Sequence, residues 1–212
     1  MNSKPPSPKV TDWDQYYRHD PFLSLFTRPF IFGALLRTLQ RYSAPHPVLV
    51  ELGGAGSRVF DAVQRTIQPT AYHVVDTNEY GLRLMRDKTG YGSVFLHLQD
   101  ALHPPVNVRA DTAFSIGLIE HFDPEGTRKV IVSHLELLKP GGIAVITFPT
   151  PTLLYRLSRG ISELAGKWAF HDERPLRMPE IRAAIEGAGA LLHERLIWQT
   201  PLTQTIVAIQ KR

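Results

Sequence analysis

Two hydrophobic patterns divide the chain. Up to about residue 45, apolar residues recur at helical spacing, whereas from Pro47 onward short apolar runs alternate with longer amphipathic stretches. The second pattern is typical of a largely parallel β-sheet that is covered by helices on both faces. We therefore predict an α/β protein. Its expected fold is a Rossmann-like αβα sandwich with a seven-stranded, mostly parallel sheet, an antiparallel last strand, N-terminal helices and a helical insertion after the fifth strand.

The individual elements follow from the length and period of each stretch. Short apolar runs predict strands at residues 48–51, 72–76, 94–98, 112–116, 143–148, 191–198 and 205–210. Amphipathic stretches predict helices at residues 13–19, 21–42, 58–66, 79–88, 125–138, 153–168 and 179–187. The sequence Lys139-Pro140-Gly141-Gly142 predicts a sharp stop and a turn between the helix before it and the strand after it.

The chain shows no internal repeat or low-complexity interior, so we predict a single domain over residues 11–212. Within it, residues 11–45 are expected to form a helical lid and residues 151–177 an insertion on the substrate side. The Pro-rich residues 1–10 are expected to form a disordered tail.

Composition narrows the class of protein. Hydrophobic content of 43% and charged content of 21% are ordinary for a globular fold. The chain has no cysteine, which excludes a disulfide scaffold, a thiolate zinc site and a cysteine nucleophile, and fits a reducing cytoplasm. No apolar stretch suits a signal peptide or a transmembrane segment, although peripheral membrane contact stays open.

The distribution of charged residues along the sequence does not favour a nucleic-acid partner. The net charge is +4, but the Lys and Arg residues are dispersed and do not alternate with aromatic residues as in stacking platforms. The histidines show no i, i+4 pairing with acidic residues of the kind found in a metal site, so we predict no metal site. A small-molecule acceptor is the expected partner, and the oligomeric state stays open.

The first predicted strand runs into a turn of small residues that opens a helix. Gly53, Gly54 and Gly56 allow a ligand to approach the backbone closely, and the turn offers N–H groups at a helix N-terminus. Glu51 precedes the turn, and Asp76 ends the next strand. A carboxylate at that position can accept two hydrogen bonds from vicinal ribose hydroxyls.

With the Lys-Pro-Gly-Gly turn, this order of motifs resembles the class I S-adenosylmethionine-dependent methyltransferases, over about residues 47–211. The resemblance implies that Glu51 holds the methionine end of the cofactor and that Asp76 holds its ribose. It places Asp100, with the backbone of Ala101, at the adenine. The implied cofactor is S-adenosyl-L-methionine (SAM), and the implied cofactor residues are Glu51, Gly53, Gly54, Ala55, Gly56, Asp76, Thr77, Asp100, Ala101 and Ser115.

Other interpretations remain at this point. The glycines alone serve tight turns in many folds, Asp100 is also suited to capping a turn, and Glu51 to anchoring the N-terminal helices. An NAD-dependent oxidoreductase fits less well, because Ala55 and Arg58 stand where its motif requires glycines. An RNA methyltransferase and a non-catalytic module with the same fold are the remaining alternatives.

The acceptor side is expected beyond the fourth and fifth strands. His121, in a Glu-His pair after the fourth strand, is a candidate general base or a residue that only positions its loop. Candidate substrate residues are Tyr17 in the aromatic N-terminal segment and Tyr155, Arg156 and His171 in the insertion. The resulting hypothesis is a methyltransferase (EC 2.1.1.-) for a small-molecule or glycan/lipid-type acceptor, with in-line O-methylation as the expected reaction.

Overall fold

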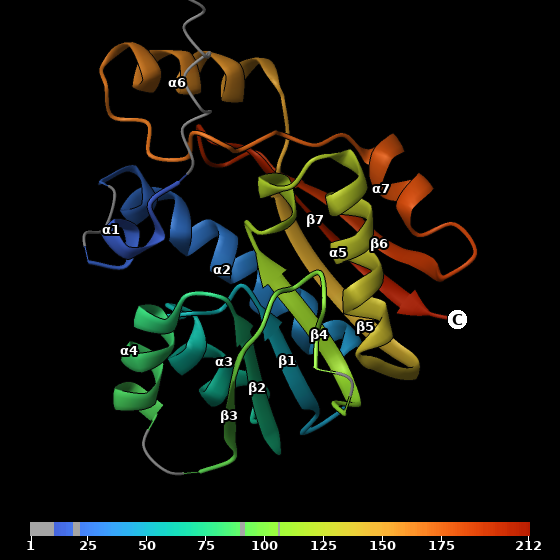
Figure 1. Cartoon of the computed structure of the whole chain (residues 1–212). Coiled ribbons are helices and arrows are strands. Elements are labelled where there is room, and N and C mark those ends of the chain that lie inside the picture. Colours follow the sequence, from blue (N-terminus) through green and yellow to red (C-terminus); the bar gives the residue numbers. More distant parts are fainter. Residues whose placement is uncertain (1–10, 19–21, 90–91, 106) are drawn as a thin grey trace, which may run out of the picture.

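The computed structural model describes residues 11–18, 22–89, 92–105 and 107–212. The predicted disordered tail at residues 1–10 lies outside the described residues. Most of the described chain is organised around one β-sheet (Figure 1).

The sheet has seven strands in the order β3-β2-β1-β4-β5-β7-β6. Neighbouring strands from β3 to β5 run parallel, and β7 runs antiparallel to both β5 and β6. The predicted fold, with its antiparallel last strand, is therefore confirmed. The strands are β1 (Val48–Leu52), β2 (Ala71–Asp76), β3 (Val94–Leu98), β4 (Ala110–Ile116), β5 (Leu138–Pro149), β6 (Gly189–Ile197) and β7 (Gln204–Lys211).

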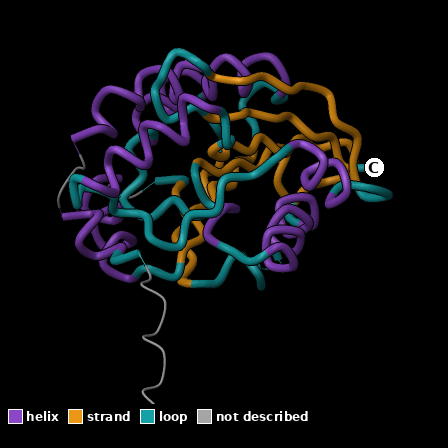
Figure 2. The backbone as a smooth tube through the Cα atoms, turned by 90° about the horizontal axis from the view of Figure 1, so that it is seen from above, coloured by secondary structure: helices purple, strands orange, loops and turns teal. Residues whose placement is uncertain are grey.

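Helices cover both faces of this sheet, and Figure 2 shows them on either side of the strands. Residues of α2, α3 and α4 pack on one face, and residues of α5 and α7 pack on the other. The helices are α1 (Trp13–Arg18), α2 (Phe22–Tyr42), α3 (Phe60–Ile67), α4 (Glu79–Thr89), α5 (Pro124–Glu136), α6 (Leu153–Leu164) and α7 (Met178–Ala184), with a short 3-10 helix η1 (Ile119–His121).

The alternation of side chains along each strand builds two cores. In β1, Leu49 faces the α2–α4 side, whereas Val50 and Leu52 face the α5–α7 side, and all three are fully buried. Both faces of the central strands are therefore apolar, which explains why these strands appear in the sequence as continuous apolar runs.

The Lys-Pro-Gly-Gly motif differs from its prediction. Helix α5 ends at Glu136, and β5 already begins at Leu138, so the motif lies inside the strand rather than between helix and strand. Gly141 has a positive φ of 77°, and the pairing with β4 shifts register between Ala110 and Thr112. The motif is thus an irregularity in a long strand, which glycine permits because it tolerates positive φ.

The insertion after β5 begins with α6, which the side chain of Thr152 caps by accepting a hydrogen bond from the Tyr155 N–H at 3.1 Å. The helix ends at Leu164 rather than at residue 168 as predicted, and Trp168 lies in the returning loop. Figure 1 shows α6 beyond the tip of β4, at the carboxyl end of the parallel strands. This end of the sheet is where open α/β folds bind their ligands.

Candidate active site

A cavity of about 410 Å³ lies at the carboxyl ends of the strands. Its volume is within the range of roughly 300–1,000 Å³ that is usual for small-molecule sites. Most of the predicted site residues line it, namely Tyr17, Glu51, Gly53, Ala55, Gly56, Asp76, Thr77, Asp100, Ala101, His121 and Tyr155. Four predicted residues, Gly54, Ser115, Arg156 and His171, are not in its lining.

The loop after β1 has a conformation that depends on its glycines. Gly53 and Gly56 adopt positive φ values of 69° and 62°, which L-residues with a side chain rarely adopt. A Cβ atom on Gly54 would lie 2.6 Å from the Glu51 carboxyl carbon. The loop therefore requires small residues, because the side chains of Leu118 and Tyr17 pack directly against Gly53 and Gly56.

Glu51 is buried beneath this loop. Its carboxylate accepts hydrogen bonds from the Tyr72 hydroxyl at 2.6 Å and from the Ser57 hydroxyl at 3.0 Å. Burial raises the pKa of Glu51 to about 7, although these two hydrogen bonds oppose the shift. The hydroxyl of Ser57 thus has a partner inside the protein.

Asp76, at the end of β2, holds two backbone segments together. One carboxylate oxygen accepts from the Ala55 N–H at 2.9 Å and the other accepts from the Asn78 N–H at 2.8 Å. Burial raises the pKa of Asp76, and the backbone hydrogen bonds oppose this. The Thr77 backbone also interacts with this carboxylate, which still has room to accept a further hydrogen bond. The carboxylate is therefore able to bind a ligand while it fixes the loop.

A glycine on a neighbouring helix makes space for the methyl group of Ala55. A Cβ atom on Gly81 of α4 would lie 2.6 Å from the Ala55 Cβ, so glycine at 81 leaves the necessary space. The ring of Tyr17 covers the same place, because a Cβ atom on Gly56 or Gly81 would lie 3.0 Å from it. Sequence reasoning missed Gly81, whose only signal is a glycine inside a predicted helix.

The remaining cofactor candidates fall into two groups. Asp100 and Ala101 line the cavity after β3, and one oxygen of Asp100 also accepts from the Leu102 N–H at 2.9 Å, as in a capped turn. Ser115, in contrast, is fully buried within β4, and its hydroxyl lies 3.0 Å from Nε2 of His134 on α5. Its contact stabilises the packing of α5 on the sheet.

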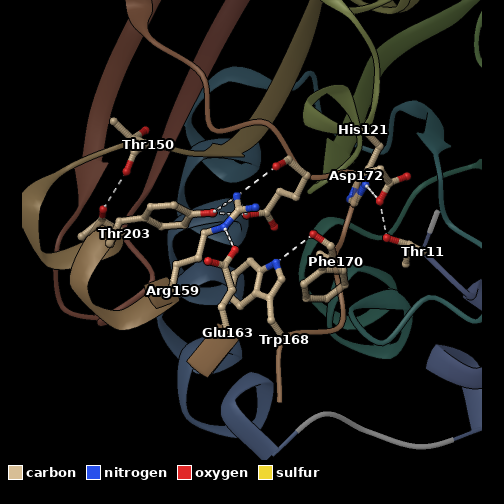
Figure 3. A network of polar contacts seen from close by, with 11 residues as sticks. Thr11, His121, Thr150, Arg159, Glu163, Trp168, Phe170, Asp172 and Thr203 are labelled. Atoms are coloured by element: carbon tan, nitrogen blue, oxygen red, sulfur yellow. Dashed lines mark hydrogen bonds and ion pairs between the residues drawn. The ribbon is translucent and has the colours of Figure 1, made fainter. Parts of the chain in front are cut away.

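His121 pairs with a residue from the insertion. Its Nδ1 lies 3.1 Å from a carboxylate oxygen of Asp172, and the Thr11 hydroxyl donates to the same oxygen (Figure 3). Burial lowers the pKa of His121, and the Asp172 carboxylate partly offsets this. When Nδ1–H donates to Asp172, Nε2 of the neutral ring carries the lone pair. This arrangement is the one that orients a histidine base.

Aromatic rings surround this pair. The Trp13 ring meets the His121 ring edge-on at a centroid distance of 4.9 Å, and the Phe170 ring lies 6.1 Å from it. Tyr16 contacts Phe170 at 5.6 Å. Helix α1 and the returning segment of the insertion therefore meet over the cavity, which excludes water from the histidine.

Glu120 adds a buried carboxyl to the cavity lining. It is 1% exposed, and among the described residues its Oε2 atom has no hydrogen-bond partner. Burial, with the nearby negative charge of Glu173, raises the pKa of Glu120 well above its usual value. A buried polar atom without a partner is costly. Glu120 is thus poised to interact with a bound molecule.

The insertion contributes a polar cluster to the cavity wall. The Tyr155 hydroxyl donates to Glu173, and Arg159 donates to the Glu173 carbonyl at 2.9 Å and to the Glu163 carboxylate at 2.7 Å. Burial raises the pKa of Glu173 to about 7, against the opposing effects of Tyr155 and Arg159.

Two candidates from the insertion lie elsewhere. Arg156 and His171 are exposed at the surface. Sequence reasoning assigned no role to Asp172, because only the fold brings it next to His121. It assigned no role to Glu120 either.

Within residues 11–18, 22–89, 92–105 and 107–212, no group of three or more His, Asp or Glu residues is arranged to hold a metal ion. The same part of the chain has no helix with the length and apolar character needed to cross a membrane.

Comparison with known proteins identifies the fold. No family model and no curated sequence matches the chain. Solved structures of S-adenosylmethionine-dependent methyltransferases do match it over nearly its whole length, so the chain has the fold of this class.

Three of the matching solved structures, two of them methyltransferases, illustrate the match. The magnesium protoporphyrin IX methyltransferase ChlM of Synechocystis, solved with S-adenosylhomocysteine (SAH), has a TM-score of 0.74 at 14% identity, covering 94% of this chain and 94% of that chain. The N-methyltransferase NodS of Bradyrhizobium japonicum, also with SAH, gives 0.69 at 14% identity, covering 93% and 95%. A possible exported protein of Bordetella parapertussis gives 0.68 at 21% identity, covering 99% and 76%.

Proposed function

We propose that the chain is a SAM-dependent methyltransferase that methylates a hydroxyl group of a small-molecule or glycan/lipid-type acceptor. One observation carries this proposal. The cavity joins a glycine loop and a second-strand carboxylate on one side to a His121–Asp172 pair on the other. The neighbours of known activity that share the fold are methyltransferases, two of them solved with SAH.

The cofactor side of the cavity suits SAM, which supplies an activated methyl group on a sulfonium. Asp76 still has room to accept from ribose hydroxyls beside its backbone bonds. The methionine portion would bind along the loop of Gly53 and Gly56, and Asp100 with Ala101, which also line the cavity, would bind the adenine. Glu51 acts from beneath, by fixing the loop through Ser57 and Tyr72.

On the acceptor side, His121 serves as the general base. When bound, SAM would supply the methyl group to the acceptor oxygen and leave as SAH, and Nε2 of His121 would take the proton that the acceptor hydroxyl loses. Asp172 stabilises the imidazolium that results. The free oxygen of Glu120 accepts a hydrogen bond from a second donor on the acceptor, which aligns it.

Binding of the cofactor is tested by calorimetry with SAM, SAH and NAD. We expect heat with SAM and SAH and none with NAD, whereas the opposite result would replace a methyltransferase by an oxidoreductase. The acceptor is then sought by transfer from radiolabelled SAM into separate fractions of metabolites, glycans, lipids and RNA. Label in RNA alone would contradict the proposed acceptor class, and cofactor binding without transfer to any fraction would indicate a non-catalytic module.

A further inference from the structure

Helix α6 places its apolar side chains on the outside of the protein. Five of its residues share one helical face and are exposed, from 46% for Leu154 to 92% for Leu164. They are Leu153, Leu154, Leu157, Ile161 and Leu164, and we call them the α6 apolar face. An ordinary surface helix presents its apolar face to the core, so this orientation is reversed.

The inner side of α6 is held by polar contacts instead. Tyr155 and Ser162 are its buried residues, and both line the cavity. The Tyr155 hydroxyl donates to Glu173, while Arg159 donates to the Glu173 carbonyl and lies over the Trp168 ring at 5.0 Å. These contacts fix which side of the helix faces outward. The α6 apolar face is therefore a feature of the folded protein rather than a result of a loosely placed helix.

An exposed tryptophan lies in the loop that contacts the start of α6. Trp198, which is 68% exposed, precedes residues 199–203, and the Thr203 hydroxyl lies 2.7 Å from the hydroxyl of Thr152, the cap of α6. An exposed tryptophan in a loop that is bonded to the start of a leucine-rich helix is a composition found in proteins that dock at the bilayer interface.

The charges around the face are basic. Arg156 on α6 and Lys167, just beyond it at the rim of the cavity, are both exposed, and within the described part of the chain neither has an ion-pair partner. Glu163, the acidic residue of α6, is instead paired with Arg159. Unpaired cations beside an apolar face complement anionic lipid headgroups, as they do in amphipathic membrane-surface helices.

A second copy of the chain fits this face less well. Two copies that met through α6 would bring the like charges of Arg156 and Lys167 together, and Glu163, the acidic residue of α6, is already paired with Arg159.

We propose that the α6 apolar face docks the protein on an anionic lipid surface, with the leucines inserted between headgroups and the basic residues against the phosphates. Since the inner side of the same helix lines the cavity, docking brings the cavity wall to within one helix diameter of the membrane. This proposal concerns binding to lipid and is independent of methyl transfer.

The test is co-sedimentation of the full chain with vesicles of phosphatidylcholine alone and of phosphatidylcholine mixed with phosphatidylglycerol. We expect binding to the mixed vesicles that weakens with added salt and little binding to phosphatidylcholine alone. The double variant Leu157→Ser with Ile161→Ser should bind the mixed vesicles at least about tenfold more weakly, because inserted aliphatic side chains supply the affinity. The single variant Leu164→Ser, at the most exposed position, should show a smaller loss.

Leu192→Ser is the matched control, because Leu192 is an exposed leucine (43%) on the edge strand β6 rather than on α6. It should bind vesicles as the wild type does. Calorimetry with SAH on each variant reports the cavity separately, so a loss of vesicle binding is distinguished from a failure of the proposed function. No binding of the wild type to mixed vesicles, or equal binding of all variants, would overturn the proposal. A wild-type dimer that the double variant converts to a monomer would assign the face to a second copy instead.

Discussion

Replacing Asp76 by alanine tests the cofactor assignment most directly. Of roughly four acceptor positions on a carboxylate, the Ala55 and Asn78 N–H groups use two and the Thr77 backbone also interacts with the carboxylate, so about one or two remain for the hydroxyls of a ribose. Loss of hydrogen bonds to a charged acceptor costs about 1.5–3 kcal/mol. The Kd for SAH measured by calorimetry should therefore rise about 10- to 150-fold in Asp76→Ala.

The variant also leaves two backbone N–H groups without an acceptor, so a loss of stability must be separated from a loss of binding. Circular dichroism verifies the fold, and Asp87→Ala serves as the control because Asp87 is an exposed carboxylate outside the cavity. A ribose-deoxygenated analogue of SAH provides a second comparison. Removing the ribose hydroxyls should weaken binding to the wild type but not to Asp76→Ala. If both proteins lost equal affinity, or if folded Asp76→Ala bound SAH normally, Asp76 would not be the ribose ligand.

Three further predictions follow from the site. His121→Gln, which keeps a hydrogen bond but no base, should lower turnover about 10²–10⁴-fold with SAH affinity nearly unchanged, and near-normal turnover at saturating acceptor would exclude the base. Burial raises the pKa of Glu51 in the folded protein to about 7 from 4.5, so thermal stability should fall as pH rises between these values. The slope of thermal stability against pH should be flatter in Glu51→Gln, and an equal slope in the two proteins would contradict the shift. Gly81→Ala should lower the free energy of unfolding in denaturant titrations by about 1–3 kcal/mol, because the new methyl group clashes with Ala55. Adding Ala55→Gly should restore part of this stability, and no rescue would show that the strain does not come from Ala55.

The sheet could be predicted from the sequence because its strands are buried on both faces. Strands with this environment appear as short apolar runs, and the predicted bounds of β3 agree with the structure at both ends. The start of β5 was missed, because Lys139-Pro140-Gly141-Gly142 has the composition of a turn, and only the pairing of Leu138 and Ile143 with β4 on either side of it joins it to the strand. The 3-10 helix η1 was not predicted either, since three residues carry no periodicity.

The candidate site shows the same division between local and long-range information. Glu51, Gly53 and Asp76 lie at strand ends, so their place at the cavity follows from local pattern and strand order. Asp172, in contrast, reaches His121 across 51 positions through the returning segment of the insertion, and no local pattern predicts that approach. Ser115 shows the limit of a purely positional assignment, because its hydroxyl lies against His134 on the side of the sheet that α5 covers.

The short helix α1 touches both halves of the cavity. Tyr17, near its end, covers Gly56, whereas Trp13, at its start, contacts His121. The two contacts are only four residues apart on one helix, so a shift at one is transmitted to the other. By thermodynamic reciprocity, a cofactor that moves α1 changes acceptor affinity by the same factor as the acceptor changes cofactor affinity. The cofactor, near Tyr17, and the acceptor, near Trp13, should therefore bind cooperatively although they contact different residues of α1.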